Sequence, residues 1–390
     1  MEVEQVRTPL KVLSVPVSML TGLLVLRHRA RRRILKSAEE RATPDGISSA
    51  EAVTLGGVEQ WILIQGEDRD KPVLLVLHGG PGMPFPGVSY RTRSLLGQED
   101  SELAKHFVVV YWDQRGSGKS NGPDVPKESI TIDRLTSDAV ELADLLGRRF
   151  GVEKVFLAGI SWGTVLGLGA AAKAPEKFEA YVGMAQIANW AESDRLAYRW
   201  ALERAEETDN QKAIEGLREI GAPPWGDFAR WSTLRQWLML LGGFYRSGGD
   251  PSAWRKRISE VVPFLAPGLP ALLAPFFVSP DYGLSDLLRL FVGLKTSQEA
   301  LLDDIADLDF FDSVPRVEVP VLFFHGAHDQ AVQLLIARRY FEALEAPRGK
   351  RLDVLEESAH IFSPRDAARV EAALIERLPE LARSGMVGAE

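Results

Sequence analysis

The sequence contains no cysteine among its 390 residues, which excludes a disulfide, a thiolate metal site and a cysteine nucleophile. Histidine is scarce as well, with six in the chain, and no group of histidines and carboxylates has the spacing of metal ligands. We therefore expect no metal. The remaining composition is ordinary, with 45% hydrophobic and 26% charged residues, which rules out a disordered or fibrous chain.

Basic residues are outnumbered by acidic residues except at the N-terminus. Residues 1–40 hold eight of the 46 Lys and Arg and four of the 54 Asp and Glu, so they carry a net charge of +4. Residues 41–390 then carry 38 basic and 50 acidic side chains, a net charge of −12. An acidic body argues against nucleic acid as a partner, because nucleic-acid binding depends on clustered basic side chains.

The N-terminal extension, residues 1–40, contains a candidate membrane segment. Residues 12–26 are uncharged and would reach about 22 Å as a helix, against about 30 Å for a bilayer core. Five arginines and Lys36 follow the apolar run, an order that does not fit a cleaved signal peptide. If the segment spans, these charges place the body in the cytoplasm. The alternatives are an interfacial helix that contacts anionic lipid through residues 10–36, and a solvated tail or partner-binding helix.

Strand and helix patterns alternate along residues 50–186 and 316–380, which we expect to form one core. Five short apolar runs are typical of buried parallel strands: residues 73–77, 107–112, 155–158, 321–324 and 352–355. A helical pattern begins near Thr131 and ends before Gly151, and residues 54–65 suggest an antiparallel lead-in. The alternation predicts an α/β fold with a doubly wound, mostly parallel sheet flanked by helices.

Residues 187–315 interrupt this alternation. They have mainly helical patterns and hold six of the nine tryptophans: Trp190, Trp200, Trp225, Trp231, Trp237 and Trp254. Because the insertion lies between two strands of the sheet, we expect a helical cap, or lid, that lines a cleft. The alternative is a helical subdomain whose aromatic side chains form only its own small core.

Residues 159–163, GISWG, follow the strand at 155–158 and precede a helical pattern. A G-x-S-x-G sequence in that context is a nucleophile elbow, in which glycines allow a sharp turn that exposes the serine. Ser161 is the candidate nucleophile, and the Trp162 amide at the helix N-terminus can donate to a developing oxyanion. The alternative is a tight turn without a catalytic role.

A second glycine-rich loop, HGGPG at residues 78–82, follows the strand at 73–77. Its glycines let backbone N–H groups approach a substrate, and Gly80 is the candidate second oxyanion donor. We expect the ring of His78 to brace this loop.

The catalytic base is found partly by elimination among the six histidines. His360 lies on a loop after the strand at 352–355, and Asp329 follows the strand at 321–324. The chain order Ser161, Asp329, His360 is the order that this architecture requires. His360 would take the serine proton, and Asp329 would fix its tautomer and stabilise the imidazolium. For each residue taken alone, a role without catalysis is the alternative: Asp329 as an aspartate in a turn, and His360 as a histidine on a surface loop.

Residues 116–120, GSGKS, look like the end of a phosphate-binding loop but do not complete one. The position that needs glycine holds Asp113, and the segment leads to Pro123 rather than to a helix. We therefore expect no nucleotide site here.

Taken together, HGGPG, WDQRGSGKS at residues 112–120, GISWG and the loops of Asp329 and His360 resemble the α/β-hydrolase fold family, and within it the prolyl aminopeptidase-like branch. The resemblance covers roughly residues 50–380. It implies a serine hydrolase that needs no cofactor, with a helical cap and with Gly80 and Trp162 as oxyanion donors. In the peptidases of this branch, cap carboxylates hold the free amino group of an N-terminal residue, often proline. Glu192 and Glu203 lie in the corresponding region.

We therefore expect hydrolysis of a small peptide or ester through an acyl-enzyme. The first hypothesis is release of an N-terminal residue, as by a prolyl aminopeptidase, and the second is carboxylesterase or lipase-like hydrolysis of hydrophobic esters. Epoxide hydrolysis and dehalogenation are disfavoured, because they need a carboxylate where Ser161 stands. A catalytically silent, membrane-tethered binding protein is the hypothesis from a different class.

Overall fold

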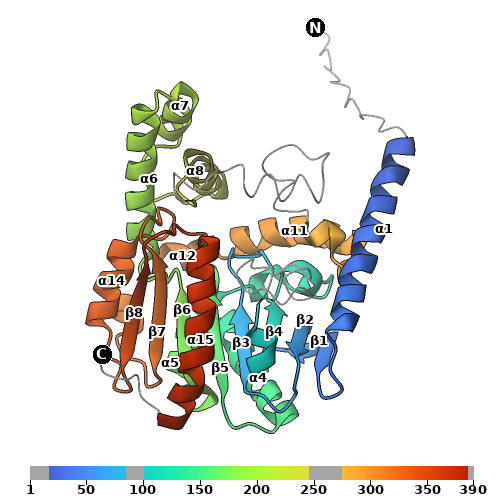
Figure 1. Cartoon of the computed structure of the whole chain (residues 1–390). Helices are drawn as coiled ribbons and strands as arrows, with labels where there is room; N and C mark the ends of the chain where they lie inside the picture. Colours follow the sequence, from blue (N-terminus) through green and yellow to red (C-terminus); the bar gives the residue numbers. More distant parts are fainter. Residues whose placement is uncertain (1–16, 85–100, 246–274, 385–390) are drawn as a thin grey trace.

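The structure is a computed structural model that describes residues 17–84, 101–245 and 275–384. Eight strands form one sheet in the order β1-β2-β4-β3-β5-β6-β7-β8 (Figure 1). The strands are β1 (Ile47–Leu55), β2 (Val58–Gly66), β3 (Val73–Leu77), β4 (Val108–Asp113), β5 (Val155–Ile160), β6 (Phe178–Met184), β7 (Val321–Gly326) and β8 (Lys350–Leu355). All neighbours from β4 to β8 pair in parallel, so the predicted mostly parallel sheet is confirmed.

The antiparallel lead-in is the hairpin β1–β2, which pairs antiparallel with β4 through β2. It begins earlier than expected, at Ile47 rather than at residue 54. Its turn needs glycine for two reasons. Gly56 and Gly57 have φ of +52° and +79°, and a β-carbon on Gly56 would lie 2.4 Å from Nη2 of Arg115.

Strand β6 has no counterpart among the five runs expected from the sequence. Its residues, FEAYVGM, are buried except for the half-buried Glu179, and they pair in parallel with both β5 and β7. A glutamate near the start and a glycine near the end break the apolar run, so the pattern does not stand out. Only the pairing on both sides reveals that a strand is required here.

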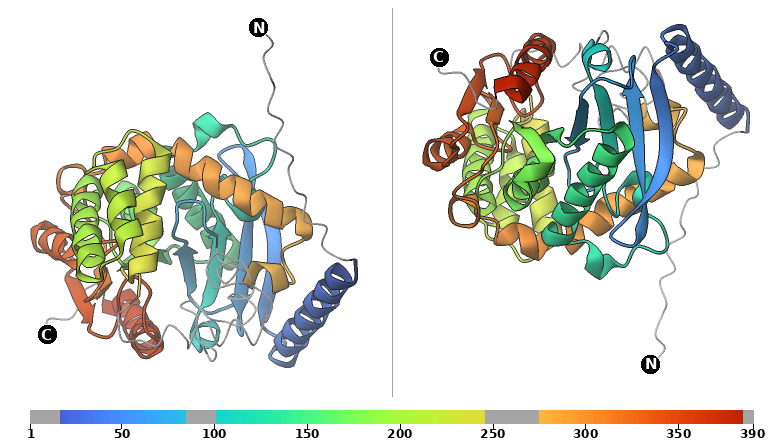
Figure 2. Two further views of the ribbon diagram at one scale, coloured as in Figure 1. Left: turned by 90° about the horizontal axis from the view of Figure 1, so that it is seen from above. Right: turned by 90° about the horizontal axis from the view of Figure 1, so that it is seen from below.

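The two faces of the sheet have separate hydrophobic cores, because alternate strand residues point to opposite faces. In β3, Val73, Leu75 and Leu77 pack on one side, whereas Leu74 and Val76 pack on the other. Helices cover both faces (Figure 2). They are α4 (Ile132–Phe150), α5 (Trp162–Lys173) and α14 (Leu334–Ala343) on the first face, and α3 (Leu103–His106) and α15 (Pro364–Ser384) on the second.

Helix α4 confirms the helix expected from residue 131 to residue 150. The Thr131 side chain accepts a hydrogen bond from the Arg134 amide at 3.2 Å, which caps the N-terminus. Gly151 ends the helix in the left-handed conformation, with φ of +66°. Short 3₁₀ turns lie at Gly118–Ser120, Lys127–Ser129 and Pro175–Lys177.

The described part of the chain between β6 and β7 is mainly helical, with short irregular connections. The helices are α6 (Trp190–Glu207), α7 (Gln211–Ile220), α8 (Phe228–Leu241), α11 (Leu284–Ala300), α12 (Leu302–Ala306) and α13 (Phe310–Ser313). Figure 1 shows α6, α7 and α8 beyond the end of the sheet, with α11 running across it. Residues 246–274, with Trp254, lie outside the described residues. That residues 187–315 act as a cap stays a prediction.

Helix α1 (Val17–Glu40) carries the described part of the N-terminal extension. Two of its arginines tie it to the segment before α11. Arg27 donates to the carbonyls of Phe277 and Tyr282 at 2.7 and 2.8 Å, and Arg31 donates to that of Pro280 at 2.5 Å. Among the described helices, none combines the length and apolar character needed to cross a bilayer. Residues 10–16 of the candidate membrane segment lie outside the described residues.

Candidate active site

Ser161 stands at a strained turn between β5 and α5. Its φ and ψ are +53° and −118°, a conformation that a residue with a side chain rarely adopts. The Ser161 amide donates to the carbonyl of Met184 at 2.8 Å, at the end of the neighbouring strand β6. The elbow expected from GISWG is therefore present, with the serine at the carboxyl end of a central parallel strand.

Both glycines of the elbow are required by close backbone contacts. A β-carbon on Gly159 would lie 2.4 Å from the carbonyl oxygen of Gly163, and one on Gly163 would lie 2.2 Å from that of Leu77. Such distances cannot be relieved by rotating a side chain, because the neighbouring atoms belong to the backbone. Ile160, the second residue of the motif, is partly buried.

Ser161, His360 and Asp329 form one hydrogen-bonded chain. The Oγ of Ser161 lies 3.0 Å from Nε2 of His360, and the Nδ1 of His360 lies 2.8 Å from Oδ2 of Asp329. The Asp329 side chain is fully buried, and that of His360 is 11% exposed. The other oxygen of Asp329, Oδ1, accepts from the amides of Ala331 and Val332 at 2.9 and 2.8 Å, which fixes the carboxylate. The three residues expected to act together thus lie together.

Gly326, which belongs to no sequence motif of the site, lets the two loops meet. It ends β7, and a β-carbon there would lie 2.1 Å from the carbonyl oxygen of Ala359. The His328 amide also donates to the Ser358 carbonyl at 3.0 Å. The loop that carries Asp329 is therefore held directly against the loop that carries His360.

His78 and Gln114 link the HGGPG loop to the elbow. The His78 ring contacts the Gly79 carbonyl through Nδ1 at 2.7 Å and accepts from the Gln114 amide through Nε2 at 3.2 Å. Gln114 also donates to the His78 carbonyl and accepts from the Trp162 indole at 3.0 Å. Burial lowers the pKa of His78 to about 4, so its ring is neutral near neutral pH. His78 therefore braces the loop, as expected.

The residue of that loop in contact with the nucleophile is Gly79. A β-carbon there would lie 3.4 Å from Cβ and 3.9 Å from Oγ of Ser161. Gly80 follows, with φ of +124° and a cis bond to Pro81. Trp162 is the first residue of α5, so its amide has no carbonyl within the helix to which it can donate.

Thr164 supports the elbow from behind and is a second residue that sequence patterns did not indicate. Its hydroxyl donates to the Ser161 carbonyl at 2.6 Å and accepts from the Ile187 amide at 3.1 Å. The Thr164 carbonyl in turn accepts from the hydroxyl of Tyr181 at 3.1 Å. The strained serine is thus fixed by polar contacts from β6 and from the chain that follows it.

The buried side chains of the WDQRGSGKS segment make structural contacts. Arg115 is 2% exposed and forms a buried ion pair with Asp138 of α4, with Nε and Oδ2 2.7 Å apart. The Asp113 carboxyl accepts from the Tyr282 hydroxyl at 2.5 Å and from the Lys119 amide at 3.0 Å. Burial raises the pKa of Asp113 to about 7, although these hydrogen bonds oppose the rise.

Of the cap carboxylates implied by the resemblance, neither lies free beside Ser161. Glu192 pairs with Arg339 of α14, with oxygen and nitrogen 2.6 Å apart, and Glu203 is exposed. The carboxylate of α6 that is buried is Asp194, which pairs with Arg235 of α8.

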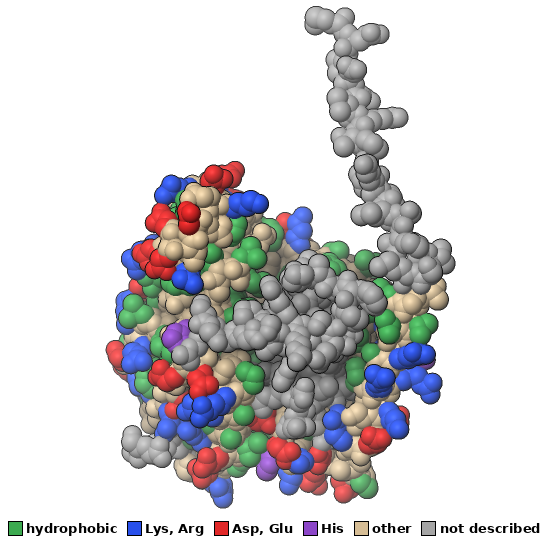
Figure 3. Space-filling model, turned by 45° about the horizontal axis from the view of Figure 1, so that its top comes forward, with side chains coloured by type: hydrophobic (Ala, Val, Ile, Leu, Met, Phe, Trp, Pro, Cys, Tyr) green, Lys and Arg blue, Asp and Glu red, His purple; other side chains and the backbone are tan. Residues whose placement is uncertain are grey.

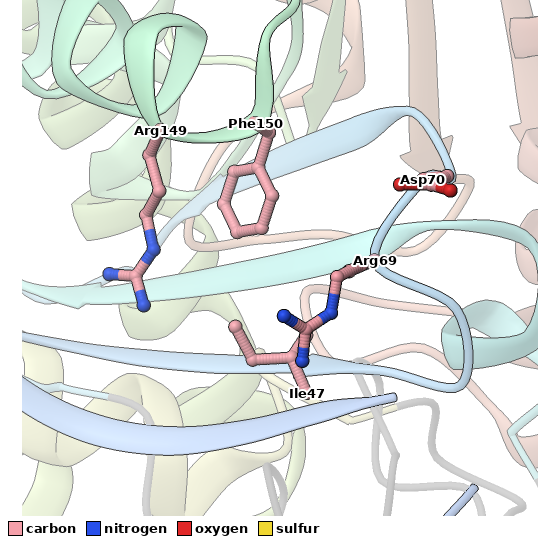
Figure 4. A pocket seen from close by; sticks show the side chains of 5 residues that line it. All are labelled: Ile47, Arg69, Asp70, Arg149 and Phe150. Atoms are coloured by element: carbon pink, nitrogen blue, oxygen red, sulfur yellow. The ribbon is translucent and has the colours of Figure 1, made fainter. Parts of the chain in front are cut away.

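A pocket of about 190 Å³ lies near the end of the sheet at which the parallel strands begin, away from the end that carries Ser161. It is lined by Ile47, Arg69, Asp70, Arg149 and Phe150 (Figure 4). It shares no residue with the Ser161 site. Within the described residues, no three histidine, aspartate or glutamate side chains gather as they would around a metal ion.

Comparisons with known proteins bear on the fold and the family. The family model described as the alpha/beta hydrolase fold matches residues 72–246. The probable aminopeptidase YbaC of Bacillus subtilis is 32% identical over 315 residues, which are 80% of this chain and 91% of that protein. A proline iminopeptidase of Thermoplasma volcanium is 35% identical over 123 residues, which are 31% of this chain and 37% of that protein.

A solved structure of similar fold is the proline iminopeptidase of Mycobacterium smegmatis. It has a TM-score of 0.53 and 19% identity, and the match covers 86% of this chain and 99% of that one. The chain therefore belongs to the α/β-hydrolase fold family, in its prolyl aminopeptidase-like branch.

Proposed function

We propose that this protein is a serine hydrolase that works through an acyl-enzyme formed on Ser161. One observation carries the proposal: Ser161, His360 and Asp329 form a continuous hydrogen-bonded chain, with distances of 3.0 and 2.8 Å. A serine hydroxyl is a weak nucleophile unless a neighbouring base takes its proton. The intact chain argues against a catalytically silent binding protein.

In the proposed reaction, Nε2 of His360 takes the proton from Oγ of Ser161 as the oxygen attacks the substrate carbonyl. The imidazolium that results is stabilised by Asp329, and it returns the proton to the leaving group as the tetrahedral intermediate collapses. Water then attacks the acyl-enzyme in the same way, with His360 taking its proton and returning it to Oγ of Ser161. The amides of Trp162 and Gly80 are the proposed donors to the oxyanion, supported by the first-turn position of Trp162 and by the Gly79 contact with Ser161.

For the substrate, we propose a small peptide from which an N-terminal residue is released. The aminopeptidase and proline iminopeptidase names of the relatives support this choice. The second candidate is an ester with a hydrophobic acyl group. It is favoured by the pairing of Glu192 with Arg339, because a carboxylate already in an ion pair is a poorer ligand for a substrate ammonium group.

We also propose that residues 10–36 attach the protein to the cytoplasmic face of a membrane. Leu24, Val25 and Leu26 of α1 are each more than two-fifths exposed, and the exposed arginines at 29, 32 and 33 follow them. Figure 3 shows blue Lys and Arg side chains gathered along this helix. An apolar stretch beside a basic one suits an anionic lipid surface. Flotation of the full chain and of a variant without residues 1–40 on anionic vesicles tests this proposal.

The proposed hydrolase is tested by labelling purified protein with a fluorophosphonate probe, beside the Ser161→Ala and His360→Ala variants. We expect one adduct, at Ser161, that is absent in both variants. Proline amides and short-chain esters then distinguish the two substrate classes, because the peptidase requires a free α-amine. Well-folded protein without an adduct would contradict the hydrolase proposal.

A further inference from the structure

Two helices of the expected cap, α6 and α8, meet in a cluster of polar and aromatic side chains. Trp190 and Trp231 stack with centroids 6.3 Å apart, and the guanidinium of Arg235 lies 5.7 and 4.8 Å from the two rings. Arg235 also binds Asp194 through Nη2. Ser193 precedes that aspartate and is 5% exposed. Spacings of three and four residues put each helix's contribution on one face.

Four polar atoms of this cluster are buried without a hydrogen-bond partner among the described residues. They are Nε1 of Trp190, Nε1 of Trp231, Nη1 of Arg235 and Oγ of Ser193. Both tryptophans are less than one-tenth exposed. Buried donors are nearly always paired, because an unmet donor costs roughly 1–3 kcal/mol. Four such atoms on two helices that pack together indicate a site that receives an acceptor from outside the described residues.

The cluster lies beside the proposed catalytic residues. The ring of Trp190 packs edge-on against Trp162, with centroids 6.4 Å apart. At the other end, α8 leads into Phe244, whose ring lies edge-on to His360 at 5.1 Å. Arg235 precedes the end of α8 by about two turns, or roughly 10 Å.

We propose that this cluster is a subsite for a carboxylate carried by the substrate. Three of the four unpaired groups can only donate, and the fourth is a hydroxyl that can donate. A guanidinium N–H with two indole N–H groups suits the two oxygens of a carboxylate. The carboxylate in this cluster that could bind an ammonium group is that of Asp194, and it already pairs with Arg235. The inference deepens the proposed function and rests on it.

Binding is measured by calorimetry in the Ser161→Ala variant, so that the result does not depend on turnover. The probes are the tripeptide Pro-Gly-Gly and its C-terminal amide, and hexanoate and hexanamide for the ester alternative. We expect at least one acid to bind roughly tenfold more tightly than its amide, as a charge-assisted hydrogen bond provides. Equal affinities of the acid and its amide in both pairs would overturn the proposal. So would the absence of binding of either acid at 10 mM, a concentration that corresponds to a binding free energy of about −2.7 kcal/mol.

Trp231→Phe then locates the effect, because it removes the indole N–H and keeps an aromatic ring. The preference for the acid should fall toward one in that variant and in Ser193→Ala. The matched control is Trp225→Phe, because the Trp225 indole already donates to the carbonyls of Ile220 and Gly221. A preference that persists in Trp231→Phe and Ser193→Ala would place the carboxylate elsewhere and refute the subsite. Loss of fluorophosphonate labelling at Ser161 in the wild-type chain would instead refute the proposed function alone.

Discussion

Replacement of Asp329 by asparagine tests how the buried carboxylate orients His360. Oδ1 of Asp329 accepts from two backbone amides, those of Ala331 and Val332. An asparagine must keep its oxygen at that position, because an NH₂ group cannot accept. Its NH₂ group is thereby forced to face Nδ1 of His360, where Oδ2 of the aspartate accepts in the wild-type protein. The imidazole must then carry its proton on Nε2, toward Ser161, and it can no longer act as a base.

We therefore expect Asp329→Asn to slow the reaction at Ser161 by about 10⁴-fold, the loss known when an aspartate of this kind is replaced in a serine protease. At about 1.4 kcal/mol for each factor of ten, this corresponds to about 5 to 6 kcal/mol of transition-state stabilisation. The assay is the second-order rate of fluorophosphonate labelling at pH 7, which needs no knowledge of the substrate.

A matched control is Asp353→Asn on β8, whose carboxylate pairs with Arg351 and Arg377 on the surface. It should label at the wild-type rate. Thermal unfolding of both variants shows whether the fold is kept. Labelling of folded Asp329→Asn within tenfold of the wild-type rate would refute the argument from the fixed oxygen.

Three further changes test the supporting structure. We expect the Asp113→Asn variant to be more stable than the wild type at pH 8 but not at pH 4. The pKa of Asp113 is raised from 3.8 to about 7, so the wild-type folded state loses stability as the pH rises between those values. At about 1.36 kcal/mol per pKa unit, the difference in the free energy of unfolding is at most about 4 kcal/mol, and urea unfolding measures it. Arg115→Leu should cost about 3–5 kcal/mol by leaving the Asp138 carboxylate buried without its main partner, and adding Asp138→Leu should recover part of that loss in the same assay. Gly163→Ala should lose about 3 kcal/mol or more and most labelling, because its β-carbon meets the Leu77 carbonyl at 2.2 Å; wild-type melting would contradict this.

Much of the fold could be predicted because its strongest signals are local. The apolar runs of β3, β4, β5 and β7 are short, continuous and bounded by glycines or polar residues, as buried parallel strands are. The helix α4 carries its own cap and its own terminating glycine. Strand β6 was missed because Glu179 interrupts its pattern, and its burial depends on two neighbours that lie far apart in the sequence.

The candidate site divides in the same way. Ser161, Asp329 and His360 were found from residue type, local motif and chain order, and the structure brings them together. Gly326, Gln114 and the cluster around Arg235 were not found from the sequence. Their roles depend on contacts with residues between 30 and 50 positions away, or on another helix, and no local pattern records such a contact.

By itself, the sequence determined the class of fold, the nucleophile elbow and the absence of any cysteine chemistry, because each depends on residue types at short spacings. Tertiary structure alone decided that Arg115 and Asp113 are buried structural groups and that Glu192 pairs with Arg339. It also decided that α6 and α8 hold four buried polar atoms with no partner among the residues that the structure describes. The physical reason is that burial and pairing are properties of surroundings. A side chain's charge and hydrogen bonds acquire their meaning from the elements that pack against it, and those elements come from distant parts of the chain.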